Sequence, residues 1–375
     1  MIRKSTNRFA SPAHANRFCK TNLPATNITC RHFFFNALKK HFSFVILNPM
    51  YHKFVLFCCT VLLLFTSCSS LRNIALNSVS TSLSGANKKG IPIKRSSKNA
   101  EEDPMLAITG ETDVTLVSDF FPTVLEMYEI LHRSNPQHAG LSTMTGSLNV
   151  MYANAFVQGP AEFLSPAEYA LQDAEYARAK LHYLRGRNYC LAALEKRYKG
   201  FSEAVLSTDT AKADAAITQL DEKDVNTAYW AGAGWLGAFS LDPLNADLLG
   251  TLHSPVALLE KAAELSPDYS DGAIWELLAN FYISAPPDFG GDSERAQYCY
   301  EQALRVSGGK AAGLYVTYAR SFCIPNGDEA GYVEALQKAL SIDPNANEAS
   351  RLMTTLSQQK AAYLLKHKGD YFLEW

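Results

Sequence analysis

Acidic residues are absent from the first hundred positions of this chain. All 37 Asp and Glu residues of the 375-residue sequence lie in residues 101–375, whereas residues 1–100 hold 15 of the 35 Lys and Arg residues. The second part therefore carries a formal charge of −17 behind a basic leader. Because nucleic-acid phosphates are bound by Lys and Arg, an acidic body argues against a nucleic-acid-binding protein.

Cysteine is scarce in the acidic part. Only Cys190, Cys299 and Cys323 occur there, and their spacing fits no zinc pattern. An odd number cannot pair completely, so we predict buried free thiols, while a disulfide between two of them stays open. A folded domain of this length does not need disulfides, because it can bury an ample core.

Motifs of catalysis and of cofactor binding are also lacking. The sequence contains no HExxH, no GxSxG, no P-loop and no paired-carboxylate constellation. The histidines after residue 100 form no i,i+4 pair of the kind that holds a metal on a helix. We therefore expect neither an enzyme nor a metal or cofactor site, and we assign no catalytic residue.

One segment imitates a nucleotide-binding motif. Residues 232–237 read Gly-Ala-Gly-Trp-Leu-Gly, which is formally GxGxxG. A dinucleotide-binding fingerprint needs a strand before it and a tight turn within it, but this segment lies in an apolar helical run. We interpret it as a helix whose glycines allow another helix to pack closely.

The uncharged apolar run at residues 54–66 is shorter than the ~20 residues of a membrane-spanning helix and is typical of an export signal. The tetrapeptide at residues 65–68, Phe-Thr-Ser-Cys, has the form of a lipobox, in which Cys68 is acylated and becomes the new N-terminus. Ser69 after this cysteine favours the outer membrane over the inner one.

These features predict four segments. They are an extension upstream of a true start at Met50 (residues 1–49), a lipoprotein signal peptide (50–67), a flexible tether that begins with lipidated Cys68 (68–107) and a helical domain (108–375). The tether is rich in Ser, Asn, Lys and Gly, although a short helix is conceivable at Leu71–Leu83. An organellar transit peptide is the alternative for the extension, but a second export signal would not follow one.

The helical domain shows helical periodicity and almost no strand signals. Ser165, Pro166 and Glu168 predict a capping box at the start of a long helix over about residues 165–199. Three segments (258–269, 300–309 and 336–346) resemble the second helix of a tetratricopeptide repeat, at irregular spacings of 41 and 36 residues. We predict an all-α, tetratricopeptide-repeat-like helical solenoid of about a dozen helices with irregular repeats.

Two groups of side chains are candidates for binding. A basic group, for which Glu175 and Glu195 are expected partners, is either a solvated surface or a docking patch for an acidic partner. Its members are Arg178, Lys180, Arg185, Arg187, Lys196, Arg197 and Lys199. An aromatic group is expected to lie mostly in the core and partly on a ligand or partner surface. Its members are Tyr229, Trp230, Trp235, Trp275, Phe281 and Tyr282.

Longer phrases resemble one family. Residues 118–141, 145–164, the helix around residues 228–241 and the turn Pro-Pro-Asp-Phe-Gly-Gly-Asp at 286–292 are similar to the T component of TRAP transporters, the TatT family. The resemblance covers nearly all of residues 105–365. The family pattern has an Asp-rich acidic segment at the start of the folded domain, whereas this chain has Gly-Glu-Thr-Asp at 110–113.

The resemblance implies a periplasmic lipoprotein that serves solute uptake. Its partner would be the periplasmic solute-binding protein of a TRAP transporter, and it would form a homo-oligomer, a trimer with pores, that passes a hydrophobic ligand to that protein. The membrane would be reached through the lipid on Cys68, and the resemblance transfers no catalytic residue. The alternative is a repeat scaffold for envelope assembly, and a third hypothesis is a module that binds an apolar ligand by itself.

Overall fold

The computed structural model describes residues 77–83 and 105–372. Its contacts separate Met1–Ser67 from Cys68–Trp375, and all described residues belong to the second unit. The predicted extension, the signal peptide and Cys68 lie outside the described residues. Of the predicted tether, residues 77–83 and 105–107 are described; residues 77–83 are helical, and α4 begins within the tether at Leu106.

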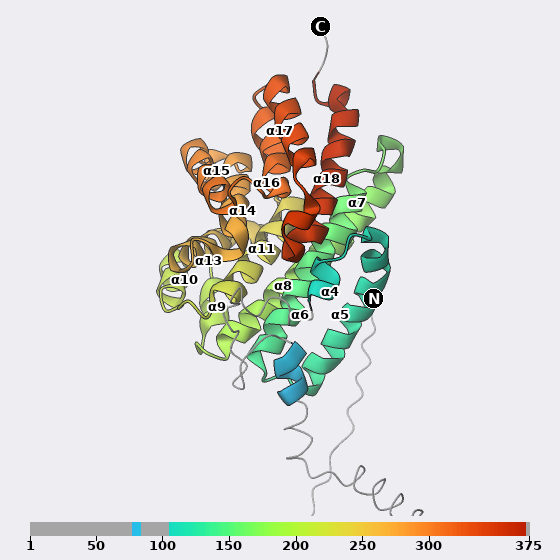
Figure 1. Cartoon of the computed structure of the whole chain (residues 1–375). Coiled ribbons are helices and arrows are strands. Elements are labelled where there is room, and N and C mark those ends of the chain that lie inside the picture. Colours follow the sequence, from blue (N-terminus) through green and yellow to red (C-terminus); the bar gives the residue numbers. More distant parts are fainter. Residues whose placement is uncertain (1–76, 84–104, 373–375) are drawn as a thin grey trace, which may run out of the picture. The chain divides into compact units, whose positions relative to one another are not determined.

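The described residues form helices and no strand, so the prediction of an all-α fold is confirmed (Figure 1). The first half contains α4 (Leu106–Thr109), α5 (Val114–Ser134), α6 (Ala139–Tyr152), the π-helical η2 (Ala153–Gln158), α7 (Gly159–Ala161), η3 (Pro166–Glu168), α8 (Tyr169–Glu195), α9 (Phe201–Val205), α10 (Thr210–Ile217) and α11 (Val225–Leu241). The second half contains α12 (Ala246–Gly250), α13 (His253–Leu265), η4 (Tyr269–Gly272), α14 (Ala273–Ser284), η5 (Pro287–Phe289), α15 (Ser293–Ser307), α16 (Ala312–Thr317), the π-helical η6 (Tyr318–Cys323), α17 (Glu329–Ser341), η7 (Pro344–Ala346), η8 (Glu348–Ser350), α18 (Arg351–Lys366) and η9 (Lys368–Asp370).

The predicted capping box is present at the start of the long helix. Ser165 donates its hydroxyl hydrogen to Glu168 Oε2 at 2.8 Å, and the same carboxylate accepts from the Ser165 backbone N–H at 3.1 Å. Residues 166–168 form a 3-10 turn before α8, which ends at Glu195. The helix is thus confirmed, with bounds a few residues inside the predicted ones.

Close contact between glycines organises the centre of the domain, where α8 packs on α6 and α11. A Cβ atom at Gly186 of α8 would lie 2.7 Å from the Gly146 carbonyl oxygen of α6. A Cβ atom at Gly234 of α11 would lie 2.8 Å from the Tyr183 carbonyl oxygen of α8. Any side chain would force these helices apart, so the interpretation of the GxGxxG segment as a packing helix is confirmed.

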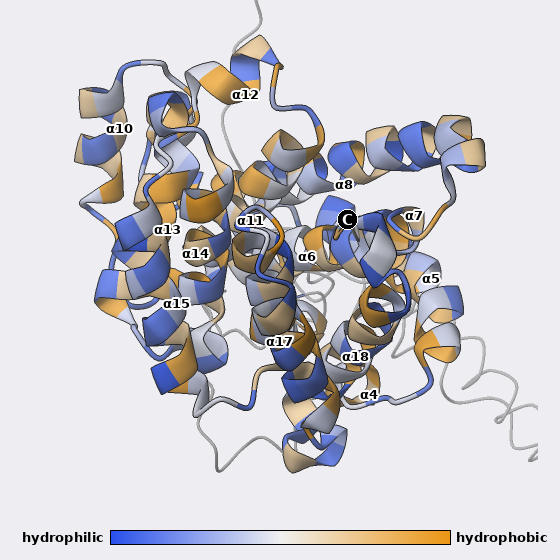
Figure 2. Ribbon diagram, turned by 90° about the horizontal axis from the view of Figure 1, so that it is seen from above, coloured by the Kyte–Doolittle hydropathy of each residue, from blue (hydrophilic) through white to orange (hydrophobic). Residues whose placement is uncertain are grey.

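The helices after α11 pack in sequence order. The pairs α13–α14, α14–α15, α16–α17 and α17–α18 are in contact (Figure 1). Ala262, Ala303 and Ala339, the small residues of the repeat-like segments, are at most 2% exposed and lie where helices approach. In Figure 2, α10, α15 and α17 each carry both hydrophilic and hydrophobic residues along their length, as helices with one buried face do. The tetratricopeptide character of these pairs stays a prediction.

The last long helix returns to the beginning of the domain. Helix α18 contacts α4 and α5 as well as α16 and α17. Arg351, its first residue, donates from Nη1 to the Gly110 carbonyl oxygen at 2.7 Å, across 241 positions of sequence. This return encloses space between the N-terminal helices and the later helix pairs.

Helical residues 77–83 lie against the end of α5. Asn135 donates from Nδ2 to Asn77 Oδ1 at 2.7 Å, and the Tyr128 hydroxyl donates to the Leu83 carbonyl oxygen at 2.9 Å. Ser80 is 1% exposed. The chain between Cys68 and the helical domain is therefore attached to the domain at these residues.

The three cysteines after residue 100 are free and buried, which confirms the prediction of buried thiols. Cys190 is fully buried between α6 and α8, and its Sγ occupies the space next to Gly146. Burial raises the pKa of the Cys299 thiol to about 11. These side chains act as small hydrophobic residues.

Candidate ligand-binding cavity

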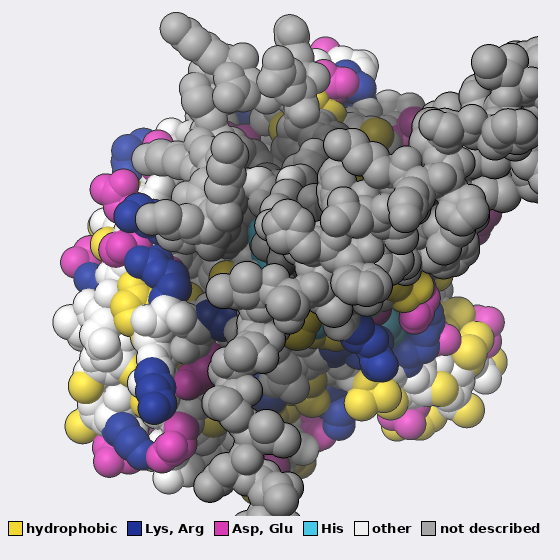
Figure 3. All heavy atoms as spheres, turned by 90° about the horizontal axis from the view of Figure 1, so that it is seen from below, with side chains coloured by type: hydrophobic (Ala, Val, Ile, Leu, Met, Phe, Trp, Pro, Cys, Tyr) yellow, Lys and Arg dark blue, Asp and Glu magenta, His cyan; other side chains and the backbone are white. Residues whose placement is uncertain are grey.

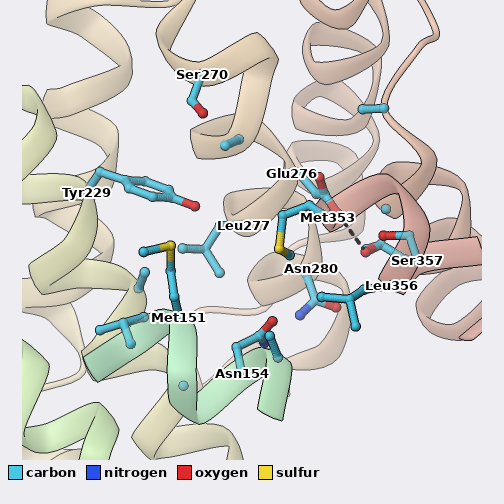
Figure 4. A pocket seen from close by; sticks show the side chains of 18 of the residues that line it. Met151, Asn154, Tyr229, Ser270, Glu276, Leu277, Asn280, Met353, Leu356 and Ser357 are labelled. Carbon is cyan, nitrogen blue, oxygen red and sulfur yellow. Dashed lines mark hydrogen bonds between the residues drawn. The ribbon is translucent and has the colours of Figure 1, made fainter. Parts of the chain in front are cut away.

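A cavity of about 1990 Å³ lies between the central helices, the later helix pairs and α18. Pockets for drug-sized ligands occupy roughly 300–1,000 Å³, so this one has room for a much larger molecule. Figure 4 shows side chains from α6, α11, α14 and α18 around it. Its position follows from the return of α18, which supplies the wall opposite α11 and α14.

Much of the wall is apolar. Met151 of α6, Leu277 of α14, and Met353 and Leu356 of α18 extend toward the same open space (Figure 4). Methionine is flexible and polarisable, so two methionines on facing walls allow the surface to adapt to ligands of different shape. The wall is suited to an alkyl chain or another extended apolar group.

Three of the six predicted aromatic residues line this cavity, namely Tyr229, Trp230 and Phe281. The Tyr229 and Trp230 rings lie edge to face with centroids 4.9 Å apart. Tyr229 also contacts the Tyr269 ring at 5.1 Å. Tyr229, Trp230 and Tyr269 therefore form a connected group of rings on the cavity wall.

The structure places Trp235, Trp275 and Tyr282 away from the cavity lining. Trp235 is fully buried beneath the Arg187 guanidinium, which lies 4.8 Å from its ring centroid. Trp275 donates from Nε1 to the Pro267 carbonyl oxygen at 2.7 Å, and the Tyr282 hydroxyl donates to a Glu260 carboxylate oxygen at 2.6 Å. These contacts hold helices together.

Glu276 is an acidic residue on the cavity wall, on α14 (Figure 4). Its carboxylate accepts a hydrogen bond from the Thr317 hydroxyl at 3.2 Å. Burial raises its pKa above the ordinary value, because the surrounding protein disfavours the charged form. Glu276 therefore adds less negative charge to the cavity than an exposed glutamate would.

Three charged side chains on the wall, those of Glu162, Arg320 and Lys360, form a cluster that we call the Glu162 cluster. Arg320 Nη1 lies 3.0 Å from Glu162 Oε2, and Lys360 Nζ lies 2.5 Å from the same oxygen. Gln158 donates from Nε2 to Glu162 Oε1 at 3.1 Å. Burial alone would raise the pKa of Glu162, but the two cations outweigh it and hold the pKa below the ordinary value.

The sequence did not single out this cluster. Its three charged residues come from the end of α7, from η6 and from α18, and no local spacing connects them. Lys360 reaches Glu162 because α18 returns to the N-terminal helices. The described structure has π-helical turns at η2 and at η6, which contains Arg320. Such turns often occur at functional sites, but no sequence pattern predicted them here.

The rim of the cavity holds an unusual backbone turn. Ser270 and Asp271 have φ values of 47° and 54°, in the left-handed region, and Gly272 follows at 93°. Side chains other than glycine are strained there by about 1–3 kcal/mol each, and such strain concentrates at ligand sites. Asn347 donates from Nδ2 to Asp271 Oδ2 at 3.0 Å and so fixes the turn to the segment before α18.

Most of the basic group on α8 is paired within the chain. The ion pairs join Arg178 to Glu175, Lys180 to Asp242, Arg185 to Glu129, and Arg197 to Asp221 and Asp224. Glu195, an expected partner, instead accepts from the backbone N–H groups of Gly200 and Ser202. On the face shown in Figure 3, basic and acidic side chains likewise lie beside one another. This favours the solvated surface over the docking patch.

Two searches of the described ranges bear on other classes of site. No described helix has both the length and the apolar character of a bilayer-crossing segment. Among the same residues, no group of three or more His, Cys, Asp or Glu side chains is placed to hold a metal ion.

Comparison with known proteins identifies the family. The sequence pattern of the TRAP transporter T-component family matches residues 110–372. A protein of Treponema pallidum (strain Nichols), described as uncharacterized, is 39% identical over 330 residues, which are 87% of this chain and 100% of the relative. The matched range contains the cavity-lining helices from α5 to α18. The chain belongs to the TRAP transporter T-component family.

Proposed function

We propose that this chain is a lipid-anchored periplasmic accessory component of a TRAP transporter, which docks the periplasmic solute-binding protein and passes it a hydrophobic ligand. The observation that carries the proposal is the large cavity, with its apolar wall, inside a domain of the T-component family. A scaffold for envelope assembly has no need of such a cavity. The family is one of transport accessory proteins, which supports a role without catalysis.

The lipid anchor rests on the lipobox at residues 65–68. Acylation of Cys68 with a diacylglycerol and a further fatty acid such as palmitate supplies the multiple chains that stable anchoring needs. Cells fed radiolabelled palmitate should label the wild-type chain and leave Cys68→Ser unlabelled. The label should fractionate with the outer membrane, and labelling of both chains would contradict the proposed anchor.

The proposed homo-oligomer has a candidate surface on α5. Leu116, Phe120, Met127 and Ile130 are 49–62% exposed, and their spacing of four, seven and three residues places them along one side of the helix. Exposed apolar stripes of this kind mark protein contacts. Native mass spectrometry of the full chain should give a trimer, and the double variant Phe120→Glu, Ile130→Glu should give a monomer with an unchanged melting temperature.

Affinity capture tests the transport role. The full chain, tagged at its C-terminus, is expressed in its source cells, cross-linked in intact cells and purified from detergent-solubilised membranes. Mass spectrometry should recover a periplasmic solute-binding protein at a ratio near one per chain, and a tagged unrelated lipoprotein should recover none. Recovery of outer-membrane assembly proteins alone would favour the scaffold and contradict the proposal.

A further inference from the structure

The Glu162 cluster carries an excess of positive charge. Arg320 and Lys360 approach the same oxygen of Glu162, at 3.0 Å and 2.5 Å, so two cations share one carboxylate. The side chain of Glu162 is only 13% exposed. The cluster therefore has one positive charge in excess, with which an additional anion in the cavity would pair.

The pKa of Lys360 is affected by the excess of positive charge. Burial lowers its pKa, Glu162 raises it, and the neighbouring Arg320 lowers it, with a net result below the ordinary value. An additional anion would favour the charged lysine. A ligand in the cavity can contact Arg320, because this side chain lines the cavity and is 40% exposed. Only Nη1 of its guanidinium approaches Glu162, so N–H donors on the other nitrogens can bind a ligand.

The remainder of the cavity suits an apolar body. Met151, Leu277 and Leu356 project into the open space from three different helices (Figure 4). A small hydrophilic anion would leave these side chains facing water and most of the roughly 1990 Å³ unfilled. A molecule with one anionic end and a long alkyl part satisfies the cluster and the apolar wall together.

We infer that the cavity binds an anionic amphiphile, with its carboxylate or phosphate head group held by Arg320 and Lys360 and its alkyl chain against the methionine and leucine wall. Glu162 holds the two cations side by side and offsets their mutual repulsion in the absence of ligand. This inference rests on the proposed ligand-carrying role and adds the chemical class of the ligand. It also assigns Arg320 as the specificity-determining residue, because arginine matches carboxylate and phosphate oxygens in a bidentate manner.

Photo-crosslinking of the full chain in lipid nanodiscs tests the inference. Three probes carry the same diazirine-bearing 16-carbon chain and end in a carboxylate, a phosphate or a hydroxyl group. Cross-linked peptides are mapped by mass spectrometry, and the half-maximal probe concentration is measured for peptides from α6, α14 and α18. The two anionic probes are expected to label these peptides at about tenfold lower concentration than the alcohol, which corresponds to one charge-assisted hydrogen bond.

The variants separate head-group recognition from folding. Arg320→Gln and Lys360→Gln should raise the half-maximal concentration of the anionic probes about tenfold and leave the alcohol unchanged. Arg320→Lys should recover part of the loss. Glu162→Gln should lower that concentration, since it removes the competing carboxylate, and the anionic probe should raise the melting temperature of this variant. Arg305→Gln and Lys338→Gln, which remove one exposed charge each, are the matched controls.

Each outcome decides one question. Preference for the carboxylate alone identifies a fatty carboxylate, and equal preference for both anions identifies any anionic alkyl head; either supports the inference. Equal labelling by all three probes, unaffected by the Arg320 and Lys360 variants, overturns it and leaves an apolar cavity that still serves the proposed function. Absence of labelling from the cavity peptides with every probe overturns the ligand-carrying role itself, whatever protein the capture experiment recovers.

Discussion

Gly146 and Gly186 face each other where α6 crosses α8, so closely that a Cβ atom on Gly186 would lie 2.7 Å from the Gly146 carbonyl oxygen and 2.6 Å from Val150 Cγ2. This contact, with that of Gly234 against Tyr183, brings three long helices together at the centre of the domain. Two of these helices, α6 and α11, line the cavity. The position of that part of the cavity wall therefore depends on the absence of side chains at the glycines.

Gly186→Ala should destabilise the domain. A methyl group has no room at this position, and overpacking of this kind costs about 1–3 kcal/mol in the free energy of unfolding. Urea denaturation followed by circular dichroism measures the change. Gly369→Ala, where a Cβ atom meets nothing within 4 Å, is the control and should change the unfolding free energy by less than about 0.5 kcal/mol. Equal effects of the two substitutions would contradict the crossing.

The carboxylate of Asp224 stabilises the junction between α8 and α11. Asp224 is 2% exposed and accepts hydrogen bonds from the Arg197 guanidinium, the Tyr198 hydroxyl at 2.7 Å and the Asp221 backbone N–H at 3.0 Å. Asp224→Asn should destabilise the domain by about 1–3 kcal/mol, because it weakens a buried acceptor of several hydrogen bonds, while Arg197 keeps its ion pair with Asp221. Thermal unfolding measures the loss. The exposed Asp173→Asn should have almost no effect, and similar losses would contradict the role of Asp224.

The raised pKa of Glu276 predicts how stability depends on pH. Between its unfolded pKa near 4.5 and its higher folded pKa, the folded state binds more protons than the unfolded state, so the contribution of Glu276 to stability falls as pH rises through this range. Glu276→Gln removes this loss. The unfolding free energy of the variant, minus that of the wild type, should therefore increase between pH 4.5 and pH 8.

The pH series has a matched control. Glu301→Gln removes an exposed carboxylate on α15, and its difference from the wild type should stay nearly constant over the same range. A Glu276→Gln difference that is also constant, or that decreases with pH, would show that the folded protein does not disfavour the charged form of Glu276.

Burial predicts that the three thiols after residue 100 are unreactive in the native protein. Cys190, Cys299 and Cys323 are at most 4% exposed, and burial raises the thiol pKa of Cys323 to about 11, so little thiolate forms at neutral pH. N-ethylmaleimide should label their peptides only after denaturation. Rapid labelling of any of the three in the folded chain, or a disulfide between two of them, would contradict the packing of their helices.

Local sequence patterns were sufficient for the helical fold class and for the start of the long helix, α8. The capping box of Ser165 and Glu168 is formed by residues three positions apart, so the sequence alone predicts it. The glycines of α11 likewise indicate close helix packing without any knowledge of the neighbouring helices. The aromatic group shows where local patterns stop. Tyr229 and Trp235 lie six positions apart on α11 and so point to different sides of it, one to the cavity and one to the core. Without the neighbouring helices, the sequence does not distinguish the two sides.

The Glu162 cluster depends on contacts between distant parts of the chain. Glu162 and Arg320 are far apart in sequence, and each reads by itself as an ordinary charged residue on a helix. The pairing of Glu162 with the third member, Lys360, requires α18 to return to the N-terminal helices, a connection made by contacts such as that of Arg351 with Gly110. Such closure is a property of the whole chain, which is why periodicity and motif spacing did not predict the cavity.

The central claim is that this chain hands a ligand directly to a solute-binding protein, and a transfer experiment tests it most directly. The full chain in nanodiscs is loaded with a fluorescent long-chain carboxylate and mixed with the solute-binding protein recovered by affinity capture. We predict that the probe reaches the partner faster than it is released to empty nanodiscs, and that the transfer rate rises with partner concentration. A transfer rate equal to the rate of spontaneous release at every partner concentration would contradict the account.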